Sequence, residues 1–204
     1  VLFRSRGEYL LFLNNDVEII TESWLEEMLQ LCQQKDVGMA GAKLYYPDDT
    51  IQHAGVVVGL GGVAAHVLCK LPRDAEGYMG RLRCVQEISA VTAACMMVKT
   101  SVFKAVGGFD EELKVAFNDI DLCMKVRKYG VKIVFTPYAE LYHYESKSRG
   151  MEDTPEKQLR FSREVNCFRR KWERELLKGD PYYNPNLTLN NTDCSLRKQE
   201  KNGD

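Results

Sequence analysis

Three short stretches of this 204-residue chain carry side chains that could bind a metal ion or move a proton. The run Asn14-Asn15-Asp16 directly follows the apolar run Leu10–Leu13, a later polar stretch holds Asp119 and Asp121, and His143 follows further on. Carboxylate oxygens and imidazole nitrogens bind divalent cations, and a carboxylate can also act as a general base. Each stretch also has a plain structural interpretation, as a turn, a helix N-terminus or a buried histidine.

The elements that must position these residues follow from the hydrophobic pattern. Leu10–Leu13 resembles a strand buried on both faces, as in a parallel sheet, so Asp16 would lie at the carboxyl end, where ligands of α/β sheets bind. Further along, the spacing predicts a helix over 24–31, a strand over 37–46, a helix from 118 that ends at Gly130, and a strand over 132–135 that ends at Thr136-Pro137.

The middle of the chain offers candidates for substrate contacts. His53 and His66 could be ligands or substrate contacts, although ordinary structural roles are the simpler interpretation for both. The cluster Gly59–Gly62 lacks the spacing and the lysine of a phosphate-binding loop. The run Thr92-Ala93-Ala94-Cys95 has small side chains, which suit either close approach of a substrate to the backbone or tight packing of a helix.

Composition describes an ordinary globular protein and excludes some classes. A formal charge of -1 and a pI near 6.4 argue against a protein whose main task is to bind nucleic acid. The 7 cysteines are odd in number and form no C-x-x-C pair, a pattern typical of reduced thiols in a cytoplasmic protein. The sequence contains no apolar run of the roughly 18 residues that a membrane span requires.

The C-terminal part of the chain is predicted to be a long amphipathic helix followed by a tail. Residues 154–178 place apolar side chains on one face and arginines, with Lys171, on the other. Such a basic helix can lie on an anionic membrane, whereas packing on the domain with a solvated face is the simpler alternative. Residues 190–204 are polar and are predicted to be disordered.

Several segments, in the same order along the chain, resemble family 2 glycosyltransferases. The strand after Gly7-Glu8-Tyr9 leads into residues 14–16, where the family has an acidic D-x-D triplet. Residues 92–98 are similar to a G-A-C-M-L-V strand, and a G-G-F-D-E segment follows at 107–111. Residues 118–123 then resemble the E-D-x-D-L-C helix start, and residues 180–187 match a D-P-Y-Y-N-P-N-L ending. Asn14 and Asn118 depart from the family pattern, because acidic residues are usual at both positions.

The resemblance implies a truncated A-type glycosyltransferase fold, an α/β architecture in which a Rossmann-like mixed sheet is flanked by helices, with a C-terminal amphipathic helix added. Residues 1–150 would form the C-terminal part of the catalytic domain, 151–189 a helix and extension packed on it, and 190–204 the tail. The half that binds the nucleotide base and ribose in the family would be missing, so we expect this chain alone to be poorly active.

The resemblance also implies a reaction and its residues. The chain would transfer a sugar, with inversion, from a nucleotide-diphosphate sugar to a saccharide or lipid-linked acceptor in cell-surface polysaccharide synthesis. Mn²⁺ or Mg²⁺ would be held by Asp16 and His143, with Asn14 and Asn15 beside them in the cofactor-binding segment, and Asp119 would be the general base. The acceptor site would then draw on the following further residues: His53, Thr92, Ala93, Asn118 and Asp121.

The same resemblance leaves some alternatives open. It implies a cytoplasmic location, with peripheral association at the inner face of the membrane as a further option. Because of Asn14 and Asn118, the chain could instead be a catalytically inactive fragment or a saccharide-binding module. In the active case, the partners would be the nucleotide-sugar donor and the acceptor, without nucleic acid.

Overall fold

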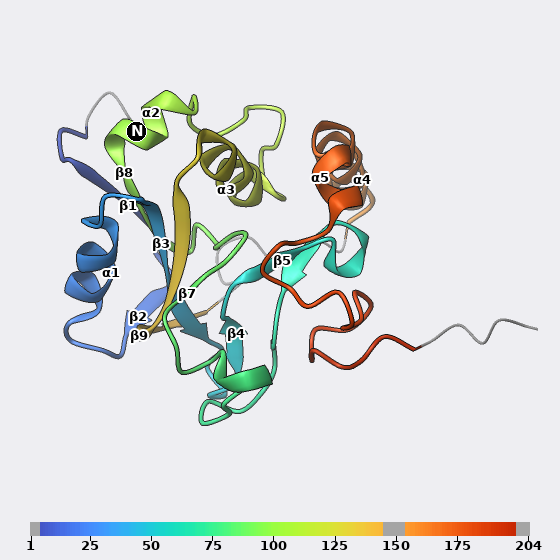
Figure 1. The fold of residues 1–204 in the computed structure, drawn as a ribbon. Helices are drawn as coiled ribbons and strands as arrows, with labels where there is room; N and C mark the ends of the chain where they lie inside the picture. The colour runs from blue at the N-terminus through green and yellow to red at the C-terminus, as the bar shows by residue number, and fades with distance from the viewer. Residues whose placement is uncertain (1–4, 145–153, 199–204) are drawn as a thin grey trace, which may run out of the picture.

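A mixed β-sheet forms the centre of the protein in a computed structural model that describes residues 5–144 and 154–198 (Figure 1). Within these residues the sheet has seven strands, in the order β1-β8-β3-β9-β2, with β4 beside β3 and β7 beside β9. Their bounds are β1 Tyr9–Leu13, β2 Val17–Ile19, β3 Val37–Tyr45, β4 Ile51–His53, β7 Gln86–Glu87, β8 Cys95–Lys99 and β9 Lys132–His143.

Helices cover the sheet on both sides, and a separate two-stranded hairpin packs beside them (Figure 1). The α-helices are α1 Trp24–Cys32, α2 Thr100–Ala105, α3 Asn118–Tyr129, α4 Pro155–Lys171 and α5 Glu173–Lys178. The hairpin pairs β5 Val56–Val58 with β6 Ala64–His66, and the short 3-10 helices are η1 Leu60–Gly62 and η2 Tyr78–Gly80. No helix that the structure describes is long and apolar enough to cross a membrane.

The central strand β3 is buried along its whole length because helices cover both of its faces. Ala40, Ala42 and Leu44 pack in one cluster with the buried face of α1, whereas Met39 belongs to a second cluster that includes α3 and α4. The helix predicted over 24–31 is confirmed, since Trp24, Met28, Leu31 and Cys32 recur at helical spacing and are all buried.

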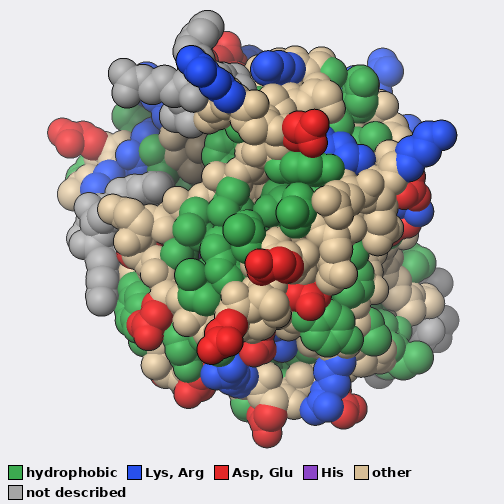
Figure 2. Space-filling model, turned by 90° about the vertical axis from the view of Figure 1, so that its left-hand side faces the viewer, with side chains coloured by type: hydrophobic (Ala, Val, Ile, Leu, Met, Phe, Trp, Pro, Cys, Tyr) green, Lys and Arg blue, Asp and Glu red, His purple; other side chains and the backbone are tan. Residues whose placement is uncertain are grey.

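Strand β1 differs from its prediction. It pairs antiparallel with β8, from Tyr9↔Lys99 to Leu13↔Cys95, and does not lie inside a parallel sheet. Leu11 and Leu13 remain 36% and 41% exposed, so one face of this strand is open. Figure 2 views the molecule from the side on which β1 and α1 lie in Figure 1, and hydrophobic side chains gather across the middle of that face. A short apolar run therefore indicated a strand correctly but not its burial.

Strand β9 continues well past its predicted end at Thr136-Pro137 and so reaches His143. Its parallel pairing with β3 runs to Gly41↔Phe135 and resumes at Lys43↔Glu140. The residues between Phe135 and Glu140 therefore bulge out of the ladder, where the missing N–H of proline costs no strand hydrogen bond. Because of this bulge, β9 continues past Pro137 and ends at His143.

The C-terminal segment is more ordered than its sequence predicted. The long helix breaks at Trp172 into α4 and α5, and Lys171, expected on the outer face, turns inward. The prediction of disorder from residue 190 is wrong for residues 190–198. Cys194 is buried, the Leu68 N–H donates to Thr192 O, and Leu187 pairs with Leu196, so contacts with the domain order this polar stretch. The predicted boundary at residue 150 and the end of the tail lie outside the described residues.

Candidate active site

Asp16 and His143 lie side by side because their strands are paired. Asp16 immediately precedes β2, whose first residue Val17 pairs with His143 at the end of β9, and the Tyr144 N–H donates to the Asp16 carbonyl at 2.8 Å. Asp16 Oδ1 comes within 3.3 Å of His143 Nε2, and both side chains are largely buried, at 13% and 10% exposure. Asp16 and His143, the two predicted metal ligands, are 127 positions apart in the sequence. The fold brings them together.

The Asp16 carboxylate is short of hydrogen-bond donors. Its Oδ1 atom is buried and receives no hydrogen bond from any residue that the structure describes. A buried carboxylate oxygen without a donor is costly, so it marks a place where a cation can bind. Among the described residues no group of three His, Cys, Asp or Glu side chains converges on one point, so further ligands would come from substrate or water.

The neighbouring asparagines differ in their contacts. Asn14 is exposed, its Nδ2 atom lies 3.0 Å from His143 Nε2, and its backbone N–H donates to Ala94 O at 3.0 Å. Asn15 is exposed on the same turn. Asn14 therefore contacts the imidazole directly, although the sequence departs from the family at this position.

Gln52 contacts His143 on the side away from Asp16. Its Oε1 atom lies 2.7 Å from His143 Nδ1, and its Nε2 atom donates to the His143 carbonyl at 3.2 Å. Sequence analysis singled out the neighbouring His53 and not Gln52. The usable signal was a glutamine in a run of otherwise apolar, strand-forming residues, since a buried amide needs partners.

His53 points away from solvent and pairs with His66. The two Nδ1 atoms are 3.0 Å apart and His53 is fully buried. Burial lowers the pKa of His53 well below its usual value, and the nearby His66 and His143 lower it further. A side chain with no exposed surface cannot touch an acceptor, so the acceptor role assigned to His53 is corrected to a structural one.

A pocket of about 280 Å³ opens beside His143. It is lined by residues from β4, β6, β9, the C-terminal segment and the loops between strands, and these are Tyr46, Gln52, Ala65, His66, Cys69, Thr92, His143 and Thr192. Thr92, a predicted acceptor residue, thus shares one pocket with the candidate metal ligand. The C-terminal segment contributes Thr192, which sequence reasoning missed because it expected no order there.

Asp119 lies on the first turn of α3 and is joined to the same pocket wall. Its Oδ2 atom accepts the Ala93 N–H at 3.1 Å, and its Oδ1 atom accepts the Ile120 N–H at 2.9 Å. The Asn118 side chain in turn accepts the Asp119 N–H at 2.7 Å. Thr92, Ala93 and Ala94 therefore connect the two candidate centres, because Ala93 binds Asp119 and Ala94 binds Asn14.

Asp121 occupies a different environment from Asp119. It is fully buried, forms ion pairs with Lys171 at 2.7 Å and Lys125 at 3.2 Å, and accepts the Trp172 indole N–H at 2.8 Å. These partners leave no side-chain surface for an acceptor. The predicted acceptor role of Asp121 is therefore wrong, and the carboxylate fastens α3 to α4.

The loop that leads to Asp119 is held by one buried carboxylate of α4. Glu164 is 4% exposed and accepts three consecutive backbone N–H groups, from Lys114 at 3.1 Å, Val115 at 3.2 Å and Ala116 at 2.7 Å. Lys171, two turns further along α4, contacts Asp110 at the start of this loop. The helix thus fixes both ends of the loop before α3.

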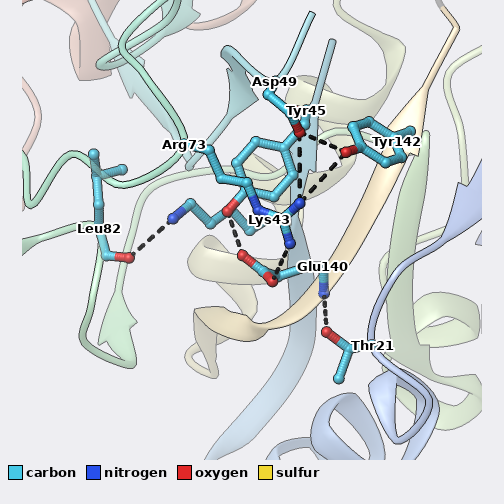
Figure 3. A network of polar contacts seen from close by, with 8 residues as sticks. All are labelled: Thr21, Lys43, Tyr45, Asp49, Arg73, Leu82, Glu140 and Tyr142. Carbon is cyan, nitrogen blue, oxygen red and sulfur yellow. Dashed lines mark hydrogen bonds and ion pairs between the residues drawn. The ribbon is translucent and has the colours of Figure 1, made fainter. Parts of the chain in front are cut away.

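A separate polar network joins side chains of β3 and β9 (Figure 3). Side chains alternate along a strand, so Glu140 and Tyr142 point away from the face of His143. Arg73 binds Glu140 at 3.1 Å, and the Tyr45 hydroxyl donates to the same carboxylate. Burial is the main cause that raises the pKa of Tyr45, and the Glu140 carboxylate raises it further. The Lys43 ammonium donates to Leu82 O at 3.3 Å, and burial lowers its pKa. This network stabilises the strand that carries His143.

The fold of the chain is similar to that of solved glycosyltransferases. One is a mannosyltransferase from Pyrobaculum calidifontis determined with GDP-Man and Mn²⁺, with a TM-score of 0.53, 15% identity, and coverage of 85% of this chain and 41% of that chain. The other is GalNAc-T7 determined with UDP, GalNAc and Mn²⁺, with a TM-score of 0.56, 13% identity, and coverage of 84% and 33%. The predicted A-type glycosyltransferase fold is confirmed.

The sequence comparison gives the family itself. A family described as "Glycosyltransferase like family" matches residues 1–164, and the chain belongs to this family.

Curated relatives point to the same family. An uncharacterized protein of Sinorhizobium fredii is 56% identical over 194 residues, covering 95% of this chain and 21% of that protein. The O-antigen biosynthesis protein RfbC of Myxococcus xanthus is 40% identical over 202 residues, covering 98% and 16%. A shorter match, 36% over 62 residues, is to an N-acetylglucosaminyl-diphospho-decaprenol L-rhamnosyltransferase of Mycobacterium tuberculosis, covering 30% and 20%. The chain spans about a fifth of the length of these relatives.

Proposed function

We propose that this chain contributes the metal-binding and base-bearing centre of an inverting transferase that moves a sugar from a nucleotide-diphosphate sugar to a hydroxyl of a saccharide or lipid-linked acceptor. The observation that carries the proposal is the pairing of Asp16 Oδ1 with His143 Nε2 at 3.3 Å, in which the carboxylate oxygen lacks a donor. Support also comes from the family and from the Mn²⁺ in the two solved neighbours.

The residues present fit a hard divalent cation of the Mn²⁺ or Mg²⁺ type. Ligands at about 2.1 Å on neighbouring corners of an octahedron lie about 3 Å apart, close to the observed spacing of the two atoms. One oxygen and one nitrogen leave most positions for diphosphate oxygens and water. When bound, the cation would act as a Lewis acid that neutralises the departing diphosphate.

Asp119 supplies the base in this proposal. The acceptor oxygen forms its bond to the anomeric carbon as the bond from that carbon to the diphosphate breaks, and Asp119 takes the proton of the hydroxyl. Two backbone N–H groups orient the carboxylate, and its partner Ala93 directly follows Thr92 in the pocket. A carboxylate that is already held in one orientation loses less entropy when it reaches the geometry needed for proton transfer.

The relatives and α4 support a proposed biological setting. We place the reaction in the synthesis of cell-surface polysaccharide, at the cytoplasmic side of the membrane, because an O-antigen biosynthesis protein is among the relatives. On α4, Leu159 is 54% exposed and lies beside Arg163 and Arg170, a combination suited to an anionic lipid surface. Co-sedimentation with phosphatidylglycerol vesicles tests this contact, and equal recovery with neutral phosphatidylcholine vesicles would contradict it.

The decisive experiment measures Mn²⁺ binding to the full-length protein with and without UDP or GDP. We expect weak binding of Mn²⁺ alone and markedly tighter binding with nucleotide, because the protein offers only two ligands. Asp16→Ala and His143→Ala should each abolish the nucleotide-dependent gain, whereas Glu22→Ala, which removes an exposed carboxylate outside the site, should leave it intact. Unchanged Mn²⁺ binding in both ligand variants would overturn the proposed centre.

A further inference from the structure

Gln52 reaches across the end of β3 to hold His143 at two points. Taken as whole residues, Gln52 is 4% exposed and His143 is 8% exposed, so both hydrogen bonds are made away from water. One joins Gln52 Oε1 to His143 Nδ1 at 2.7 Å, and the other joins Gln52 Nε2 to the His143 carbonyl at 3.2 Å. A single amide therefore contacts both the ring and the backbone of the same residue.

The backbone contact fixes which way the amide points. A carbonyl oxygen can only accept, so the Gln52 NH₂ group must face the His143 carbonyl. Its oxygen is then left to face His143 Nδ1, and an amide oxygen can only accept as well. Nδ1 of the ring must therefore carry the proton.

The tautomer set in this way has a consequence on the other side of the ring. In the neutral imidazole with Nδ1–H, Nε2 bears a lone pair. That lone pair faces Asp16 Oδ1 at 3.3 Å, where two acceptors oppose each other without a hydrogen between them. The exposed Asn14 amide donates to the same nitrogen at 3.0 Å and would have to turn away when a cation takes its place.

We infer that Gln52 is a positioning residue that holds His143 in the Nδ1–H tautomer, with the Nε2 lone pair directed at Asp16. The inference rests on the proposed function, because the lone pair matters when His143 is a metal ligand. Gln52 would not touch the metal, the donor or the reacting atoms. Partners of this kind orient the imidazole of metal-binding histidines, and their loss costs about 10- to 100-fold in metal affinity.

The first test reads the tautomer directly and needs no metal. Long-range ¹H–¹⁵N spectra of the ¹⁵N-labelled 204-residue chain report which ring nitrogen of His143 is protonated, with the signals assigned by comparison with His143→Ala. We expect Nδ1–H in the unsubstituted chain and a mixture of tautomers in Gln52→Met, which keeps length and volume but cannot hydrogen-bond. Gln86→Met is the matched control, since Gln86 also donates to a backbone carbonyl but sits beside Phe135, at the opposite end of β9.

The second test follows the consequence for metal. Mn²⁺ affinity in the presence of UDP should fall about 10- to 100-fold in Gln52→Met and stay unchanged in Gln86→Met. An Nε2–H tautomer in the unsubstituted chain would overturn the inference even if Gln52→Met did not fold. A folded Gln52→Met with the original single tautomer would overturn it too. If Asp16→Ala and His143→Ala leave Mn²⁺ binding unchanged while the tautomer is as expected, the proposed function fails instead.

Discussion

His53 and His66 face each other through their Nδ1 atoms at 3.0 Å, with the rings at 78° to one another. Two nitrogens at this distance need one hydrogen between them, so one ring donates and the other accepts. Protonation of both rings would place two donors and two positive charges in contact. Because His53 is fully buried, the fold selects its neutral form.

The histidine pair predicts a stability change with pH. Burial holds the pKa of His53 well below 6.5 in the folded chain, whereas the unfolded chain binds a proton near that pH. Stability should therefore be complete above pH 6.5 and fall below it by about 1.4 kcal/mol per pH unit for this one group. Urea unfolding at several pH values between 7.5 and 5.5 measures the slope. The slope should flatten in His53→Gln, and an identical slope in both chains would contradict the prediction.

Asp119 and Asp121 can be separated by substitution. Asp119→Asn keeps size and can still accept the Ala93 N–H, but cannot take a proton, so turnover should fall roughly 10²–10⁴-fold. The melting temperature should fall only slightly, because the new NH₂ group cannot accept the Ile120 N–H. Turnover is read as nucleoside diphosphate released from nucleotide sugars by the full product of the gene.

Asp121→Asn is expected to act on stability instead. We expect a loss of about 2–3 kcal/mol, less than for a fully enclosed pair because the Lys125 and Lys171 side chains are 19% and 33% exposed. Near-normal turnover in Asp119→Asn, beside an inactive but fully folded Asp121→Asn, would show that the base was assigned to the wrong carboxylate.

Glu164 should be needed for the loop before α3. In Glu164→Gln one oxygen becomes an NH₂ group, which cannot accept the N–H groups that the loop presents, so we expect a loss of about 1.5–3 kcal/mol. Hydrogen exchange at residues 114–116 should quicken. Glu156→Gln, at the exposed first turn of the same helix, should cost less than about 1 kcal/mol and leave these amides protected. Equal effects of the two substitutions would argue against a specific anchor.

Asn14→Asp restores the acidic residue that the family usually has. The new carboxylate would lie beside His143 Nε2, so Mn²⁺ affinity should rise roughly tenfold, equivalent to about 1.4 kcal/mol. Asn15→Asp adds the same charge on the same turn and serves as the control for simple electrostatic attraction. Both affinities are measured by calorimetry in the presence of UDP. Similar gains from the two substitutions would mean that the gain comes from general electrostatic attraction and not from the position of residue 14 beside His143.

Much of the fold was predictable because local patterns and long-range packing agreed. The apolar spacing of Trp24, Met28 and Leu31 is satisfied by one helix packed on one strand, and Gly130 ends α3 with the positive φ that glycine tolerates. Strand pairing was harder to predict. Nothing local in Leu10–Leu13 indicates an antiparallel partner 80 residues away, and the bulge that rescues Pro137 depends on the register of β3.

The candidate site was predictable in its types of residue but not in its contacts. Resemblance selected Asp16, Asp119 and His143, and the strand ladder explains how the first and last of these meet. Gln52 and Glu164 were missed because each acts on backbone or ring atoms of a distant segment. An isolated polar residue gives no sign of whether it will be buried, so only the assembled sheet and α4 reveal these roles.

The contacts between α4 and the loop before α3 also affect the order in which the chain folds while it is translated. Asp119 leaves the ribosome well before Glu164 and Lys171, so the strands and α3 can assemble while the loop still lacks its anchors. A nascent chain halted ahead of α4 would therefore hold the base residue on an unfastened loop. The loop before α3 would then be fixed only after translation has passed residue 171, so assembly of the candidate centre depends on α4.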